Sequence, residues 1–240
     1  MTGHSGLWPS PWPAEDGGPR RLQVPGPTAD GAVSTGPRFV GDAVEVTSRE
    51  APAATMVVLR DPGEVFLLRH TGGEGAVSWV ERIDPVTLEP LARSEDLPGG
   101  PTWPGGMAAH ANGSLYVVFG NHAHRLGTDL SVLASVELPR HAPYNSFVVL
   151  PDGHLVTKDF GGALPGTDPA EHAPPPAELC VLDPDTLAIV DRVTLSEPSV
   201  ARLSADGDTV YAVGTSALHR AHWDGSRLTV DADFAPVYRT

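Results

Sequence analysis

One hairpin pattern occurs four times in this 240-residue chain. In each copy an apolar run leads into a tight turn that contains glycine, and a run of alternating apolar residues carries the chain back. The copies are VVLRDPGEVFLLRH (57–70), MAAHANGSLYVVFG (107–120), FVVLPDGHLVTKDF (147–160) and ARLSADGDTVYAVG (201–214). Glycine is expected in each turn because a tight hairpin needs a positive φ. The turn glycines stand 50, 40 and 54 residues apart, at Gly63, Gly113, Gly153 and Gly207.

A second hairpin follows each of these, and its turn contains aspartate. The pattern is clearest at Asp84-Pro85 and Asp183-Pro184. The aspartate side chain is expected to cap the turn, and proline presets φ. Calcium ligation by these aspartates is the alternative, but the loops are too short and hold too few oxygens for six or more ligands. The second hairpins lie at 78–95, 123–138, 179–195 and 218–234.

Together the two hairpins make a unit of four antiparallel strands in about 40 residues, present four times, which is typical of propeller blades. A single four-stranded sheet cannot bury both of its faces, but neighbours that stack on it can. The 26 glycines and 25 prolines also disfavour long helices. We therefore predict an all-β fold, a β-propeller with four four-stranded blades at about 54–96, 106–139, 145–196 and 198–235.

Three segments are expected to lie outside the blades. Residues 1–50 form a proline-rich N-terminal arm with little periodicity. In one interpretation Trp8 and Trp12 pin this arm onto the blades, and in the other the arm is disordered. An insert rich in proline and glycine at 161–178 and a connector between blades at 97–106 are expected to be loops on the rim.

Four blades leave three arrangements open. They close a small ring alone, or they are part of a ring of six to eight blades, since the sequence given ends after the outermost strand of the fourth repeat. Alternatively, a homodimer completes the ring. An open row is expected to expose an apolar sheet face at each end, which favours association.

The composition of the chain argues against some classes of binding partner. The net charge of −14 and the lack of a cluster of Lys and Arg argue against a nucleic-acid partner. There is no apolar run of about 18 residues to span a membrane and no signal peptide. The single cysteine, Cys180, lies in an apolar run, so we expect a buried thiol, and the absence of a cysteine pair fits the reducing cytoplasm.

The segment YNSFVVLPDGHLVTKD (144–159) resembles the inner hairpin of two propeller groups. One is the six-bladed SMP-30, gluconolactonase and strictosidine-synthase-like group, in which an Asn before an innermost strand helps to bind an axial divalent metal. This resemblance implies Asn145 as a metal ligand. That group's Glu-Gly-Pro start is similar to Glu74-Gly75, but these residues fall at a third strand, which argues against Glu74. The other is the eight-bladed quinoprotein-dehydrogenase-like group, whose tryptophan docking motif and vicinal cysteines are missing, so PQQ is not expected.

Alignment on the turn glycine places four residues at one mouth of the propeller. Three of them are polar, and they predict a site for a small ligand, with Tyr144 either as one wall of it or packed between blades. The third copy of the hairpin has Lys158 and Asp159 where the other copies are mostly apolar, and an unpaired buried charge costs several kcal/mol. The four aligned residues, each eight before the turn glycine, are Thr55, Gly105, Asn145 and Ser199.

Hairpin geometry is expected to bring the Lys158-Asp159 pair beside Asn145. Lys158 and Asp159 are then candidate catalytic residues, and Asn145 and Asp159 candidate metal ligands. The alternative is that the pair ends a strand in water. A second candidate metal set, for Zn²⁺ or Fe²⁺, joins His122 and His124 with His110 of the same blade, although solvated histidines at a strand edge explain the pattern equally.

These observations lead to three hypotheses of function. The first is a propeller-scaffold binding protein for a small molecule or a protein partner, with its site at the axial mouth. The second is a metal-dependent hydrolase or lactonase, in which a divalent ion polarises a carbonyl. The third is a half-propeller that associates with a second copy. The chain contains no Gly-x-Ser-x-Gly, phosphate-binding or dinucleotide-binding motif.

Overall fold

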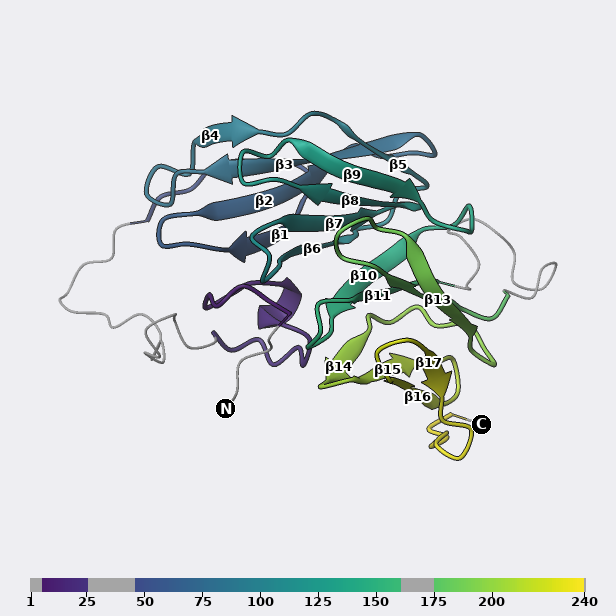
Figure 1. Ribbon diagram of the computed structural model, residues 1–240. Helices are drawn as coiled ribbons and strands as arrows, with labels where there is room; N and C mark the ends of the chain where they lie inside the picture. The colour runs from purple at the N-terminus through teal and green to yellow at the C-terminus, as the bar shows by residue number, and fades with distance from the viewer. Residues whose placement is uncertain (1–5, 26–45, 161–174, 240) are drawn as a thin grey trace.

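The computed structural model describes residues 6–25, 46–160 and 175–239. It is an all-β structure with four antiparallel sheets, one for each repeat, which are the four blades of a β-propeller (Figure 1). The one helical element in the described parts is a 3-10 turn, η1 (Glu15–Gly17). No helix in those parts has the length and the apolar character needed to cross a membrane. The predicted fold class is therefore confirmed.

Each blade follows the chain from its innermost to its outermost strand. The first blade consists of β1 (Ala54–Leu59), β2 (Val65–His70), β3 (Ala76–Ile83) and β4 (Pro90–Arg93). The second consists of β6 (Gly106–Ala109), β7 (Leu115–Phe119), β8 (His122–Leu126) and β9 (Val132–Glu137). The third consists of β10 (Tyr144–Val149), β11 (Leu155–Asp159), β12 (Glu178–Leu182) and β13 (Ile189–Thr194). The fourth consists of β14 (Ser204–Asp206), β15 (Thr209–Val213), β16 (Leu218–Trp223) and β17 (Leu228–Val230).

One expectation about the connectors is wrong. The stretch 97–106 was expected to be a loop, but Leu97–Gly100 forms a further strand, β5, which pairs with β3 of the first blade. Leu97 is 1% exposed and belongs to the apolar core, so the strand is anchored by burial. The insert at 161–178 lies largely outside the described residues, which resume at 175.

The turns form as their residues dictate. The four turn glycines have φ between 60° and 96°, a range that costs a glycine little. In the second hairpins, Asp84 Oδ1 accepts hydrogen bonds from the N–H groups of Val86 and Thr87, both at 2.8 Å. Asp183 caps its turn in the same way. The predicted capping role of these aspartates is confirmed.

Three apolar layers hold the blades together. One lies between the first and second blades, one between the second and third, and one between the third and fourth. Phe66, Leu115 and Val156 are fully buried in them, and each such side chain contributes about 1.5–3 kcal/mol of stability. None of the three layers in the described parts joins the fourth blade to the first, so the four blades form an open row (Figure 1).

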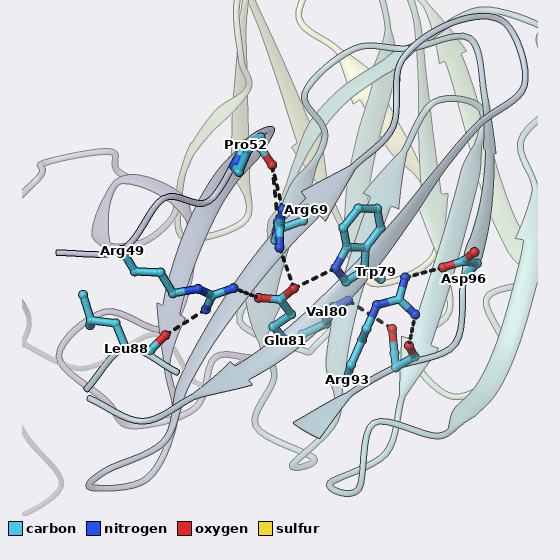
Figure 2. A network of polar contacts seen from close by, with 10 residues as sticks. Arg49, Pro52, Arg69, Trp79, Val80, Glu81, Leu88, Arg93 and Asp96 are labelled. Atoms are coloured by element: carbon cyan, nitrogen blue, oxygen red, sulfur yellow. Dashed lines mark hydrogen bonds and ion pairs between the residues drawn. The ribbon is translucent and has the colours of Figure 1, made fainter. Parts of the chain in front are cut away.

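Apolar residues such as Val57, which is 41% exposed, lie on the outer face of the first blade, and both end faces also carry networks of charged and aromatic side chains. On the outer face of the first blade, the buried Glu81 carboxylate accepts hydrogen bonds from Arg49, Arg69 and the Trp79 indole at 2.8–3.1 Å (Figure 2). The guanidinium groups of Arg69 and Arg93 stack over the Trp79 ring, 5.2 and 4.7 Å from its centroid. These contacts give part of the face a charged surface, as terminal repeats of stacked proteins have.

The fourth blade ends in a similar way. Tyr211 and Arg220 are paired across β15 and β16 on the face that points away from the third blade. The Arg220 Nε donates to Asp231 at 3.1 Å, and its guanidinium carbon lies 4.2 Å from the Phe234 ring centroid. Both end faces therefore have their charged side chains already partnered within the chain.

Candidate binding site on the inner side of the blades

Residues 6–25, called here the inner segment, run along the inner strands of the row (Figure 1). At the second blade they pair with the edge of β6. The Trp8 N–H donates to the Ala109 carbonyl at 2.9 Å, and the Ala109 N–H donates to the Pro13 carbonyl at 2.7 Å. Of the two interpretations of the arm, packing onto the blades therefore describes this part of it.

The inner segment also contacts the two end blades. At β1 the Leu59 N–H donates to the Trp12 carbonyl at 2.8 Å, and the Ser10 hydroxyl donates to the Leu59 carbonyl at 2.6 Å. At β14 the Ala205 N–H donates to the Pro19 carbonyl at 2.8 Å. The segment thus links the first and fourth blades, which share no apolar layer in the described parts.

A pocket of about 650 Å³ lies beside the inner segment, β1 and the residues that lead into β14. This volume falls within the range of ligand-binding clefts. The walls are mainly apolar, and the polar groups come from two carboxylates, one guanidinium and one hydroxyl. The lining residues are Pro11, Trp12, Glu15, Asp16, Pro25, Thr55, Met56, Val57, Leu59 and Arg202.

The carboxylates of the pocket belong to a four-residue ionic cluster. Glu15 is 6% exposed, and its two oxygens lie 2.8 Å from Arg21 Nη1 and 2.6 Å from Arg202 Nη1. Asp16 lies 3.5 Å from Arg21 and 3.8 Å from Arg202. Arg21 also donates to the Ser146 hydroxyl at 3.0 Å, and so connects the pocket to the third blade. The cluster fixes the charged wall of the pocket between three parts of the chain.

The backbone that carries this wall is held in an uncommon conformation. Asp16, Arg21 and Gln23 have φ values of 54°, 51° and 54°, in the left-handed region that non-glycine residues rarely adopt. The Gln23 N–H donates to the Asp16 carbonyl at 2.9 Å, which closes the loop. Each such residue costs about 1 kcal/mol or more, so the ionic cluster and this bond must hold the loop in place.

The structure divides the predicted site residues between two places. Thr55 is half-buried and lines the pocket. Ser199 and Lys158 are together elsewhere, fully buried, with the Lys158 ammonium nitrogen donating to the Ser199 carbonyl oxygen. Burial lowers the pKa of Lys158 to about 7. Asn145 belongs to β10, and its side chain lies outside the described parts.

Asp159 and Tyr144 form the rest of this buried group. They are directly opposite each other in the β10–β11 ladder and are 1% and 0% exposed. Asp159 Oδ1 accepts from the Glu178 N–H at 2.7 Å, and Oδ2 accepts from Arg140 at 2.8 Å. Arg140 was not singled out in the sequence. Both carboxylate oxygens of Asp159 are thus bonded within the chain, an arrangement that stabilises the third blade.

The three candidate histidine ligands are bonded to the protein in the same way. His110 Nε2 donates to the Gly153 carbonyl at 2.9 Å, and its Nδ1 accepts from the Asn112 N–H at 3.1 Å. His124 Nε2 donates to the Pro98 carbonyl at 2.7 Å, and its Nδ1 bonds the Ser135 hydroxyl at 2.9 Å. His122 stacks on His124 with the ring centroids 6.0 Å apart.

No metal cluster is formed by these residues. Within the described ranges, no three side chains of His, Cys, Asp or Glu gather as ligands would. Cys180 is fully buried, and burial raises the pKa of its thiol to about 12, which accords with the expected inert thiol.

Sequence reasoning missed most of the pocket. Trp12, Glu15 and Asp16 belong to the arm, where no periodicity announces a contact, and Arg202 precedes the short strand β14. The available signal was the density of Trp and Pro followed directly by Ala14-Glu15-Asp16, which is unusual for a disordered arm. That signal indicates that the arm packs against the folded body, but it does not indicate which blade the arm contacts.

Comparisons with known proteins give no name to this site. No family model matches the chain, and no curated protein matches it. Among solved structures, a protein of unknown function from Bacteroides caccae is similar at 14% identity, over 85% of this chain and 73% of that one, with a TM-score of 0.46. Hsv2 from Kluyvelomyces marxianus is similar at 10% identity, over 77% and 68%, with a TM-score of 0.34. A KlHsv2 variant with a Gly-Ser linker in place of loop 6CD has 14% identity, over 73% and 66%, and a TM-score of 0.35. At this level of likeness, the pocket must be interpreted from its own residues.

Proposed function

We propose that this protein is a binding protein, with the four blades as a scaffold and the pocket beside β1 as its ligand site. The observation that carries the proposal is the pocket itself, which has a volume of about 650 Å³ and walls from three parts of the chain. Trp12 and the neighbouring prolines offer a rigid apolar wall of the kind that holds a ligand at low entropic cost. Glu15, Asp16 and Arg202 place polar groups at the same pocket, which supports an oriented ligand.

The charges of the pocket favour binding over catalysis. Each oxygen of Glu15 faces a guanidinium within 2.8 Å, so this buried carboxylate is engaged in ion pairs within the chain. A general base must reach the proton of its substrate, whereas both oxygens of Glu15 already lie against guanidinium groups of the protein. The Arg202 side chain is 42% exposed and reaches Glu15 through one terminal nitrogen, so the rest of its guanidinium is available to an acceptor group of the ligand.

The test is a screen of a small-molecule fragment library against the full chain by ligand-observed NMR. Thr55→Trp fills the pocket from the edge of β1, and Thr229→Trp adds the same bulk on the exposed surface of the fourth blade. We expect fragments that bind the wild type to lose their signal with Thr55→Trp and to keep it with Thr229→Trp. Equal loss or equal retention in the two variants contradicts the proposed site.

A further inference from the structure

The edge of β1 identifies the class of ligand. We infer that the pocket takes a short peptide in an extended conformation, which adds to the inner edge of β1 as one more strand. This inference rests on the proposed function, because it assigns an occupant to the same pocket. It is carried by the backbone of β1 and by what the chain itself does at the equivalent edge of the next blade.

The first step is the direction of the backbone groups of β1. The first hairpin is closed by a hydrogen bond from the Arg60 N–H to the Glu64 carbonyl at 3.4 Å. In an antiparallel ladder, the bonds alternate between the two sides of the strand. Val58 therefore bonds towards β2, whereas Leu59 and Val57 point their N–H and C=O groups away from it. The Leu59 N–H, which donates to Trp12, and the Leu59 carbonyl, which accepts from Ser10, confirm this alternation.

The second step is that Val57 lies at the pocket. Val57 lines the pocket together with Thr55 and Leu59. Beyond the β1–β2 ladder, no hydrogen bond from another described residue reaches the N–H or the C=O of Val57. A strand edge with unpaired donor and acceptor groups is a template for another strand.

The third step is a precedent within the molecule. Ala109 occupies the position of Leu59 in the second blade, four residues before the turn glycine. Its N–H and C=O, which also face inwards, are bonded by Pro13 and Trp8 of the inner segment. The chain thus shows that an inner edge of this propeller accepts an extended segment. At β1 the inner segment covers the level of Leu59 and leaves that of Val57 to the pocket.

The remaining lining matches the sides of such a strand. Main-chain bonds give affinity in strand addition, and pockets for alternate side chains give selectivity. Trp12 and Pro11 offer an apolar surface to one side chain, and Arg202 and Asp16 offer charge to a polar one. At about 3.3 Å per residue, the edge from Thr55 to Val57 accommodates about three residues of the peptide in the ladder.

The experiment uses the full chain and a phage-displayed library of random heptapeptides, from which a binding peptide is selected, synthesised with a fluorophore and titrated by anisotropy. Val57→Pro removes the N–H that faces the pocket and leaves the bonds to β2, since proline is tolerated where a strand N–H points away from the ladder. Val57→Ala keeps the N–H and is the matched control. We expect Val57→Ala to bind within about twofold of the wild type and Val57→Pro to bind at least about tenfold more weakly.

Other outcomes overturn the inference. Equal affinity of Val57→Pro and Val57→Ala excludes pairing with this edge. If fragments bind but the library yields no peptide, the peptide inference is wrong and the proposed site stands. If neither fragments nor peptides bind, the proposed site is wrong as well. If Val57→Pro is misfolded by circular dichroism, the selected peptide is instead methylated at each backbone nitrogen in turn. Strand addition then requires that at least one methylated peptide loses about tenfold in affinity, and uniform retention overturns it.

Discussion

His110 donates a hydrogen bond from Nε2 to the carbonyl oxygen of Gly153, 2.9 Å away in the turn of the next blade. Arg60, at the equivalent position of the first blade, donates from Nη1 to the carbonyl oxygen of Gly113 at 2.8 Å. Each side chain stands three residues before its own turn glycine and bonds the turn glycine of the following blade. Polar bonds therefore align neighbouring blades where their apolar layers end.

We expect His110→Ala to lower the free energy of unfolding by about 1–3 kcal/mol, because the variant loses both bonds of a buried ring. The measurement is urea unfolding at pH 7, followed by far-UV circular dichroism. His141→Ala, at an exposed position, is the control and should change the stability by less than about 0.5 kcal/mol. A His110→Ala variant as stable as this control would show that the bond does not hold the blades.

His124 should lower the free energy of unfolding at acidic pH. Burial lowers the pKa of this fully buried imidazole to about 4, from an ordinary value of 6.5. Between these values the unfolded chain binds a proton that the folded chain does not, so stability is complete above pH 6.5 and falls as the pH drops towards 4. We expect His124 to account for a loss of about 3 kcal/mol over this range. Urea unfolding of the wild type and His124→Gln at several pH values measures the difference, with the exposed His222→Gln as the control. Parallel curves for the wild type and His124→Gln would contradict this assignment.

Lys158 has an effect of the same sign as His124, in the alkaline range. Its pKa falls from 10.5 to about 7 because its ammonium group is buried. Between pH 7 and 10.5 the unfolded chain binds the extra proton, so the stability of the wild type should rise with pH by at most about 1.4 kcal/mol per unit from this group. Lys158→Met should remove the slope and raise the stability at pH 7 by about 1 kcal/mol or more, as apolar replacements of buried charges often do. A lower stability of Lys158→Met at pH 7 would mean that the bond to Ser199 outweighs the cost of burying the amine.

Glu197 joins the third and fourth blades through one carboxylate. It accepts hydrogen bonds from the Ser216 and Ala217 N–H groups, both at 2.9 Å, and from His219 Nε2 at 2.9 Å. The Thr215 hydroxyl adds a further bond, and these bonds together lower the pKa of Glu197 to about 2, against the opposing effect of burial. The stability that this carboxylate contributes is present above pH 4.5 and is lost as the pH falls towards 2.

Glu197→Gln should cost about 2–3 kcal/mol at pH 7, because the amide group presents its own donors to the donors of the hairpin. Thermal unfolding at pH 7 measures the loss, with the exposed Glu95→Gln as the control. The difference between the wild type and Glu197→Gln should shrink as the pH approaches 3. A constant difference across that range would assign the effect to packing and not to charge.

The architecture could be predicted because short sequence patterns specify each hairpin. Gly63 and its three equivalents need a positive φ, and Asp84 and Asp183 cap their own turns, so each hairpin is specified within a few residues. Four such units of similar length then require stacking to bury their faces. Even so, Leu88 and Leu187 adopt positive φ at the ends of the aspartate turns, which their residue type does not announce.

The site could be predicted only in part, because its contacts join residues far apart in the sequence. The alignment of the hairpins found Thr55, yet the rest of the pocket depends on the path of the inner segment, which lacks any period of its own. Lys158 was recognised as an anomaly, but its partner is the main-chain oxygen of Ser199, an atom that every residue carries. Backbone partners of this kind leave no trace in the choice of side chain.

The open row has a mechanical consequence. A closed ring must divide a full turn among its blades, so a small rotation at one joint is resisted by all the others. This row has three apolar joints in its described parts and partnered charges at both ends, so a rotation at any joint adds directly to the gap between the first and fourth blades. The inner segment spans that gap, with Trp12 bonded to Leu59 of the first blade and Pro19 bonded to Ala205 of the fourth. Its length between these two bonds therefore limits how far the two blades can separate.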